Sequence, residues 1–190
     1  MSELEINHQQ FDSQFAFLTT CLGRVKNLYA LFEEEIKGDK FDYTLKFEDA
    51  SGKINTFYEE CLNSIFDSQY NFKSDVNSFY KLAPSYEEYT TFYASVATQI
   101  ALMCTSIGEF YQSRNVDLIG EVLMNVDEVI NIMKSIEYNR QNLGDDPWDY
   151  VSEFLEIEHA NRTDILEEIV DHSLSKEQFL ELVSKYVIRG

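Results

Sequence analysis

Residues 11–36 read FDSQFAFLTTCLGRVKNLYALFEEEI, and this stretch decides the fold. Its large apolar side chains recur in alternating steps of four and three positions: Phe11, Phe15, Leu18, Leu22, Val25, Tyr29, Phe32 and Ile36. Because an α-helix has about 3.6 residues per turn, this spacing places these side chains on one face. The stretch therefore predicts a long helix that ends near Gly38 and packs its apolar face in a core.

The same periodicity continues along the chain and predicts further helices. We expect them over residues 43–65, 74–82, 89–110, 118–136, 147–171 and 175–186. Ser85 with Glu88, and Ser175 with Gln178, match the capping box that opens a helix. Gly52 lies inside the first of these helices without a local reason.

The composition agrees with an all-α chain. The 190 residues include 14 Phe and 12 Tyr but only 7 Gly and 2 Pro, too few turn formers for many short strands. No repeat or linker divides the sequence. We therefore predict a single compact bundle of about seven helices over residues 1–190, with residues 1–10 frayed and residues 173–190 forming a C-terminal helix.

Residues 89–108 form the longest uncharged stretch, which is long enough to suggest a membrane span. Its many hydroxyl and amide side chains and its acidic flanks favour a buried central helix instead. The first ten residues lack the basic and apolar regions of a signal peptide. Cys21, Cys61 and Cys104 lie in apolar helical segments and are interpreted as small buried hydrophobes of a reducing compartment. These features predict a cytoplasmic protein without a membrane segment.

Negative charge is concentrated towards the C-terminal end. The chain has a formal net charge of −19, and residues 141–172 hold ten acidic side chains against one basic side chain. Asp149, Glu153, Glu156 and Asp164 recur there at helical spacing, opposite the apolar side chains of the predicted helix. Such a face can simply be solvated, or it can dock a basic partner, since clustered like charge speeds encounter with an opposite patch. Direct binding of nucleic acid is not expected, because phosphate contacts need clustered Lys and Arg.

The apolar stripe of this helix is interrupted between Ile157 and Ile165, where Glu158 and Arg162 fall at positions expected for core residues. One interpretation is an i,i+4 ion pair on a partly exposed edge of the bundle. The other is a polar contact site presented on a rigid element. The residues predicted to contact a basic partner are Asp149, Tyr150, Glu153, Glu156, Glu158, His159, Arg162 and Asp164.

No pattern in the sequence predicts catalysis. Two Glu-x-x-His pairs, Glu5 with His8 and Glu156 with His159, have the spacing of metal ligands in helical bundles. Such a site also needs inward carboxylates from two further helices, whose stripes are apolar, so we expect neither a metal nor a cofactor. There is no GxSxG motif, no P-loop and no Gly-rich dinucleotide turn. We expect a non-enzymatic protein, although catalytic groups can assemble from distant positions.

Several core segments together resemble a known family. They are Phe17–Arg24 with Tyr29–Phe32, then Tyr93–Ala94, Ala97 and Ala101–Glu109, and the step Asp146-Pro147. These segments resemble the YjaG-like family of bacterial proteins, which has no established function. The resemblance implies a compact helical bundle in the bacterial cytoplasm and brings no catalytic residues. The helix from Ser175 and the polar residues around His159 depart from the family pattern.

Two hypotheses about function follow. The first is a protein that binds and neutralises or escorts a basic protein partner, most concretely an immunity protein against a cationic nuclease toxin. An acidic, compact and cofactor-free protein suits that role, because it must recognise a positively charged cleft quickly. The second is a helical scaffold or housekeeping protein of the YjaG-like kind, acting alone or as a homodimer, which predicts an apolar surface patch.

Overall fold

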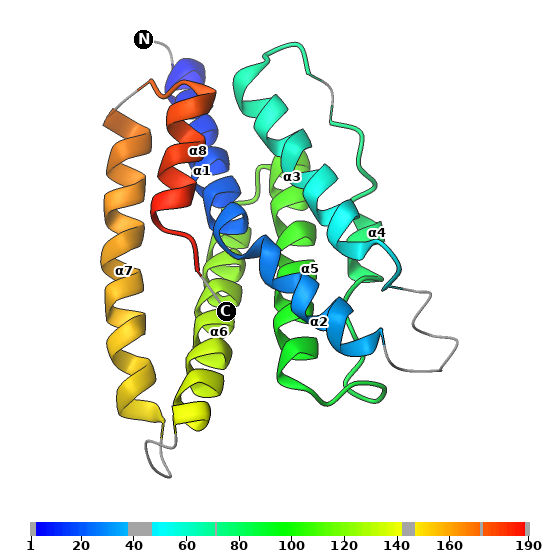
Figure 1. The fold of residues 1–190 in the computed structure, drawn as a ribbon. Coiled ribbons are helices and arrows are strands. Elements are labelled where there is room, and N and C mark those ends of the chain that lie inside the picture. Colours follow the sequence, from blue (N-terminus) through cyan, green and yellow to red (C-terminus); the bar gives the residue numbers. More distant parts are fainter. Residues whose placement is uncertain (1–2, 38–46, 71, 142–146, 172, 189–190) are drawn as a thin grey trace.

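The computed structural model describes residues 3–37, 47–70, 72–141, 147–171 and 173–188, and in these residues it contains helices and no strand. The elements are α1 Glu3–Val25, the 3-10 turn η1 Lys26–Leu28, α2 Tyr29–Ile36, α3 Ala50–Phe66, α4 Asn77–Tyr80, α5 Phe92–Ser113, α6 Asp117–Gln141, α7 Trp148–Asp171 and α8 Lys176–Lys185 (Figure 1). Apart from α4, which is a single turn, each described α-helix has eight or more residues. The predicted all-α bundle is confirmed.

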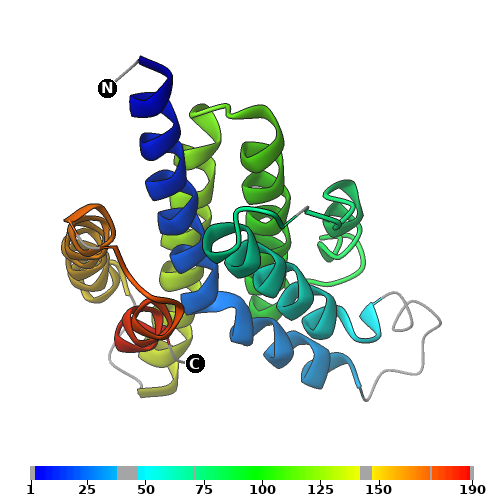
Figure 2. The same cartoon turned by 90° about the horizontal axis from the view of Figure 1, so that it is seen from above.

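The bundle is built around three helices. α5 and α6 form an antiparallel pair, and α1 packs against both of them. α2 and α4 pack against α5 and α3 against α1, whereas α7 packs against α6 and α1 on the other side, and α8 packs against α1 (Figure 2). Because α1 contacts helices from both sides, the buried side chains form one continuous hydrophobic cluster.

The sequence predicts one helix over residues 11–36, but the chain changes direction at η1 (Figure 2). α1 ends at Val25, and α2 begins at Tyr29 on a different axis. The carbonyl of Arg24, which in an unbroken helix serves the N–H four residues later, accepts a hydrogen bond from Ile188 N–H at 3.0 Å. A contact with the far end of the chain thus coincides with the bend, which the local periodicity does not reveal.

α3 also begins later than the predicted stripe. The predicted start at Tyr43 lies outside the described residues, and the helix begins at Ala50, directly after Asp49 with its left-handed φ of 57°. The Asp49 carboxylate folds back over Gly52, where any Cβ would collide with it. The close approach of the Asp49 carboxylate therefore requires a glycine at position 52. This contact explains why a glycine lies inside the helix, which the sequence alone does not.

The start of α5 differs from the prediction as well. Ser85 caps a separate turn, where its hydroxyl accepts the N–H of Glu87 at 3.2 Å and its carbonyl accepts that of Tyr89 at 2.9 Å, and this turn does not continue into α5. α5 begins at Phe92, where the hydroxyl of Thr91 accepts the N–H of Ala94 at 3.1 Å. The separate turn buries Tyr89, so packing of that ring in the core overrides the local capping pattern.

Other helix ends agree with the prediction to different degrees. α1 already begins at Glu3, inside the stretch expected to be frayed, and the helix expected from Ser74 is only the single turn of α4. The capping box of α8 is confirmed: Ser175 Oγ accepts the N–H of Gln178 at 3.3 Å, and Gln178 Oε1 accepts the N–H of Ser175 at 2.9 Å. Local capping chemistry therefore decides the start of α8.

α5 is the buried central helix predicted from residues 89–108. Its small residues Ala94 and Ala101 are at most 2% exposed, which allows its neighbours to approach closely. The hydroxyl of Thr98 donates to the carbonyl of Ala94 at 2.9 Å, so this buried polar side chain is satisfied within its own helix. Of the helices in the described ranges, none combines the length and apolarity needed to cross a membrane.

The three cysteines are fully buried and free, as predicted. Burial raises the pKa of all three thiols, and it raises that of Cys21 to about 12 although the charges of Arg24 and Arg162 act in the opposite direction. Because only a thiolate is a strong nucleophile, these protonated thiols are structural at neutral pH.

A matched pair of glycine substitutions tests the packing of α5. A Cβ at Gly108 would lie 2.5 Å from Val76 Cγ2, so we expect Gly108→Ala to lower the free energy of unfolding by about 1 to 3 kcal/mol through overpacking. A Cβ at Gly120 in α6 meets nothing within 4 Å, so Gly120→Ala is expected to raise it by up to about 1 kcal/mol. Urea unfolding of both variants measures the difference, and equal effects would contradict the packing described.

Buried acidic groups also predict how stability depends on pH. The Cys21 thiol has a pKa of about 12 in the folded protein, against 9.0 ordinarily, and burial also raises the pKa values of Tyr29 and Tyr58. The unfolded chain therefore loses these protons first, and the contribution is complete below pH 9 and is lost between pH 9 and about 12. Urea unfolding at increasing pH should show this decline. Cys21→Ala should decline less steeply, and an unchanged slope would exclude Cys21 as a contributor.

Candidate functional site

α7 carries the segment that the sequence singles out, and its inward face is continuous. The side chains that face α1 and α6 include Val151, Glu158, Arg162 and Ile165, each buried, at steps of seven, four and three. Glu158 and Arg162 therefore occupy core positions of the stripe. The stripe is not interrupted; two charged residues replace two apolar ones within it.

Glu158 is the centre of a buried ion cluster. Its side chain is 2% exposed, and its two oxygens accept hydrogen bonds from both terminal nitrogens of Arg24 in α1, at 2.8 and 2.5 Å. Arg162, one turn further along α7, donates its Nε–H to Glu158 Oε1 at 2.9 Å. One carboxylate thus pairs with two guanidinium groups, and the Arg24 pair has the bidentate geometry of strong charge-assisted hydrogen bonds.

Asp127 of α6 completes the cluster. Arg162 Nη2 donates to Asp127 Oδ1 at 2.5 Å and to the carbonyl of Leu123 at 3.3 Å. Burial alone lowers the pKa of Arg162, but the hydrogen bond and charge of Asp127, together with the charge of Glu158, outweigh this and raise it. We call Arg24, Asp127, Glu158 and Arg162 the buried ion cluster; Asp127, with 33% of its side chain exposed, is its most exposed member. The cluster has two positive and two negative groups and joins α1, α6 and α7.

The C-terminal segment closes over the same arginine. Arg24 Nε donates to the carbonyl of Tyr186 at 2.8 Å, and the Arg24 carbonyl accepts the N–H of Ile188 at 3.0 Å. The side chain and the main chain of one residue in α1 therefore hold both α7 and the segment that follows α8.

This arrangement corrects one of the two interpretations of Glu158 and Arg162. The predicted i,i+4 pair between them is confirmed, but the partly exposed edge is wrong, since Glu158 is 2% and Arg162 9% exposed. Their counter-charges come from Arg24 and Asp127, which lie 134 and 35 positions away in sequence from the residues that they pair with. In the folded protein the Glu158 carboxylate is therefore already paired, and only 2% of its side chain is exposed.

The opposite side of α7 is lined with carboxylates. We define the outer face of α7 as its exposed side chains Asp149, Glu153, Glu156, Asp164 and Glu167. Within the described parts of the chain, none of these five carboxylates forms an ion pair. The core positions of the buried ion cluster turn this row of charge towards solvent.

Tyr150 and His159, the other predicted contacts, lie on opposite flanks of this face. They are nine residues apart, which at 100° per residue places them half a turn from each other. Tyr150 is half-buried, with its ring centroid 5.5 Å from that of Tyr138 and 5.0 Å from that of Phe154. The His159 imidazole is 61% exposed, and its Nε2 lies 3.7 Å from Asp127 Oδ2. Only the carboxylates share one surface.

A groove of about 490 Å³ runs beside α7 on the Tyr150 flank. Phe154, Ile157 and Asn161 of α7 line it together with Lys134 of α6 and Lys185 of α8. Lys134 Nζ lies 4.0 Å from the centroid of the Phe154 ring. Arg24 and Glu158 also line the groove, so it has three cationic groups and one carboxylate beside its apolar side chains, and it differs in character from the acidic outer face.

Glu156 and His159 gain no further metal ligands among the described side chains. In the residues that the structure describes, no group of three or more His, Cys, Asp or Glu side chains is arranged to hold a metal ion. The side chains of Glu5 and His8 lie outside the described part.

The sequence interpretation missed Arg24 and Asp127. A signal existed for Arg24, because it is a charged residue inside the apolar segment 11–36, just as Glu158 is in α7. Two unmatched charges of opposite sign at core positions suggest each other as partners, since a buried charge must be paired. Asp127 offered no comparable signal among the acidic residues of its helix.

Comparison of the chain with protein-family models, curated proteins and solved structures gave no match. The YjaG-like resemblance therefore stays a prediction that rests on the quoted core segments alone.

Removing the central carboxylate tests the buried ion cluster. Glu158→Ala leaves two buried guanidinium groups without their shared carboxylate, so we expect the free energy of unfolding to fall by about 3 to 5 kcal/mol. Glu156→Ala, two positions earlier on the exposed side of α7, should change it by less than about 0.5 kcal/mol. Urea unfolding gives both values. A loss of only a few tenths for Glu158→Ala would mean that this carboxylate is solvated.

Proposed function

We propose that this protein is a non-enzymatic binding protein that neutralises or escorts a basic protein partner through the outer face of α7. The observation that carries the proposal is the row of five exposed carboxylates on one helix, none of which is neutralised by an ion pair with the described residues. Aligned like charges create a negative potential that attracts a cationic surface and speeds association.

Rigidity supports the same proposal. The buried ion cluster ties α7 to α1 and α6 at two consecutive turns, Glu158 and Arg162, so the helix cannot rotate without breaking charged hydrogen bonds. A charged face held in a fixed orientation needs no ordering on binding and so avoids that entropic cost.

The most concrete partner is a cationic nuclease toxin, with this protein as its immunity protein. A nuclease must attract phosphates, so its active-site cleft is lined by Lys and Arg, and an acidic helix is complementary to such a cleft. The same carboxylates repel phosphate, which argues against nucleic acid as a direct ligand.

The burial of Glu158 and Arg162 divides the predicted contact residues into two groups. In this proposal the exposed residues Asp149, Glu153, Glu156 and Asp164 contact the partner, and Tyr150 and His159 lie on the two flanks. Glu158 and Arg162 act indirectly, by holding α7 in position.

The alternative is a scaffold protein of the YjaG-like kind that acts alone or as a homodimer. Exposed apolar side chains one turn apart at the end of α7 favour it, namely Leu166 at 39% and Val170 at 58% exposed, with Leu180 of α8 at 39%. Light scattering tests this alternative: a dimer that persists in high salt favours the scaffold over the first proposal, whereas a strict monomer weakens it.

Charge reversal on the outer face tests the first proposal. The protein is immobilised, basic proteins from its source are captured at low salt, and the captured partner is used to measure binding rates. The double variant Glu153→Lys with Glu156→Lys should slow association about 10-fold or more at low salt and change dissociation less. The control is Glu87→Lys with Glu88→Lys, the same change in charge on exposed residues of the turn before α5.

The control variant should associate nearly as fast as the unchanged protein. Equal slowing of both variants would show that only the net charge matters, and an absence of any captured basic partner would count against the proposal as a whole. Raising the salt concentration should reduce the difference between the variants, because ions screen exposed charges.

A further inference from the structure

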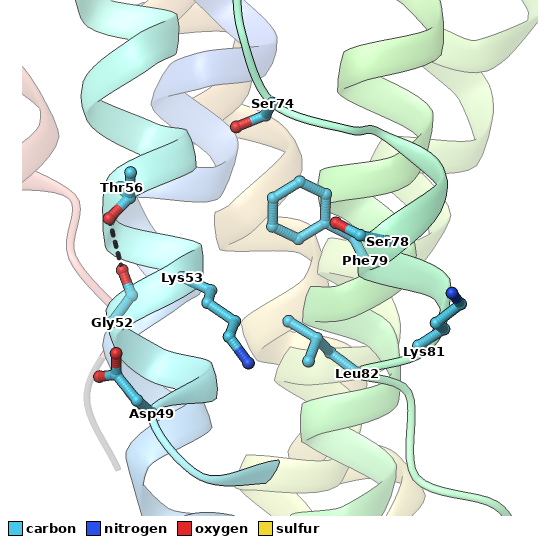
Figure 3. Close-up of a pocket in the computed structure, with 9 residues that line it drawn as sticks. All are labelled: Asp49, Gly52, Lys53, Thr56, Ser74, Ser78, Phe79, Lys81 and Leu82. Carbon is cyan, nitrogen blue, oxygen red and sulfur yellow. Dashed lines mark hydrogen bonds between the residues drawn. The ribbon is translucent and has the colours of Figure 1, made fainter. Parts of the chain in front are cut away.

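A second concave site lies on the other side of the bundle, between α3 and the segment that contains α4 (Figure 3). This α3–α4 pocket has a volume of about 480 Å³, within the range of about 300 to 1,000 Å³ that is usual for small-molecule sites. Its lining residues are Asp49, Gly52, Lys53, Thr56, Ser74, Ser78, Phe79, Lys81 and Leu82. α7 contributes none of them, so the pocket is separate from the outer face of α7.

The pocket offers hydrogen-bond donors that are not in use. Lys53 and Lys81 form no ion pair or hydrogen bond with the described residues, and neither does the hydroxyl of Ser74. The other two hydroxyls already donate to backbone carbonyls: Thr56 to Gly52 at 2.9 Å, and Ser78 to Asp75 at 2.6 Å. The unused groups are two ammonium groups and one hydroxyl, so the pocket suits a ligand that accepts hydrogen bonds.

The local charge has the opposite sign to that of the whole protein. The chain has a net charge of −19, yet this pocket is lined by two lysines and a single carboxylate. That carboxylate, Asp49, is folded back over Gly52 of its own helix, whereas Lys53 extends across the gap towards Leu82 (Figure 3). Lys81 stands on the opposite wall with its amine on the outer side (Figure 3). An anionic group in the gap would therefore meet Lys53 first.

The pocket also has an apolar wall. Phe79 is 4% and Leu82 5% exposed, and the ring of Phe79 faces the space between α3 and the α4 segment (Figure 3). The Phe79 ring contacts the Phe57 ring of α3, with ring centroids 4.7 Å apart. Little of either side chain is accessible to water, so a ligand that rests on this wall gains van der Waals contact with it and removes only a small apolar area from water.

We propose that the α3–α4 pocket binds a small organic anion whose apolar body packs on Phe79 and Leu82. Its carboxylate or phosphate group pairs with Lys53, whose amine points into the gap (Figure 3). Lys81 adds positive charge at the rim. Both anionic groups share the chemistry that the pocket recognises, and this site is independent of the partner proposed for α7.

Backbone amide chemical shifts, followed by NMR during titration with phenyl phosphate, test the proposal. We expect saturable shifts confined to the residues that line the pocket, with at least 10-fold weaker binding of phenol, which has the same ring without the charge. Titration with benzoate then tells a carboxylate site from a phosphate site, and saturable binding of either anion at these residues supports the proposal.

Two substitutions identify the binding group. Lys53→Gln should weaken binding of phenyl phosphate about 10-fold or more, because a charge-assisted hydrogen bond is lost. Lys37→Gln makes the same change in net charge at an exposed lysine that does not line the pocket, and it should leave binding unchanged.

Three results would overturn the proposal. They are the absence of saturable shifts with both anions, phenol binding as tight as that of phenyl phosphate, and equal affinities of the Lys53→Gln and Lys37→Gln variants. Both lysines are exposed, so these variants are expected to fold, and a thermal melt of each confirms this before the titration.

Discussion

The pairing of Arg24 with Glu158 is the interaction on which the rest of the structure depends. It joins the first long helix to the last long one, and Asp127 and Arg162 extend it to α6. Charged groups are costly to remove from water, so each must find its counter-charge in the folded protein. Because the cluster contains two positive and two negative groups, this requirement is met only when α1, α6 and α7 are all in place.

A buried ion pair adds less stability than an apolar pair of the same shape, and its effect here is better described as selection of one arrangement. An apolar stripe alone lets a helix slide or rotate by a few degrees at small cost. A bidentate carboxylate–guanidinium pair has a narrow geometry, and in this protein it fixes the rotation of α7. We infer that the cluster keeps the outer carboxylates pointing away from the bundle.

The bundle separates its charges between two sides. The five carboxylates on the outer face of α7 form no ion pair among the described residues. Lys53 and Lys81 of the α3–α4 pocket also form none there. α1 lies between α7 and α3 and packs against α7 on one side and against α3 on the other (Figure 2). The basic partner proposed for α7 and the anion proposed for the α3–α4 pocket would therefore use different groups of the chain.

The sequence by itself determined the elements whose signals are local. The periodic stripe of residues 11–36 predicted buried helix, and Ser175 with Gln178 predicted the start of α8, because each depends only on residues within a few turns. The tertiary structure alone decided where the chain bends after Val25, why Ser85 does not begin α5, and that Glu158 is buried. In each case the deciding contact comes from elsewhere in the fold: Ile188 at the Arg24 carbonyl, the core around Tyr89, and Arg24 at Glu158. Helical periodicity shows which side of a helix faces inward. Which charged residue of another helix pairs with a side chain on that inward side is decided only when the helices pack.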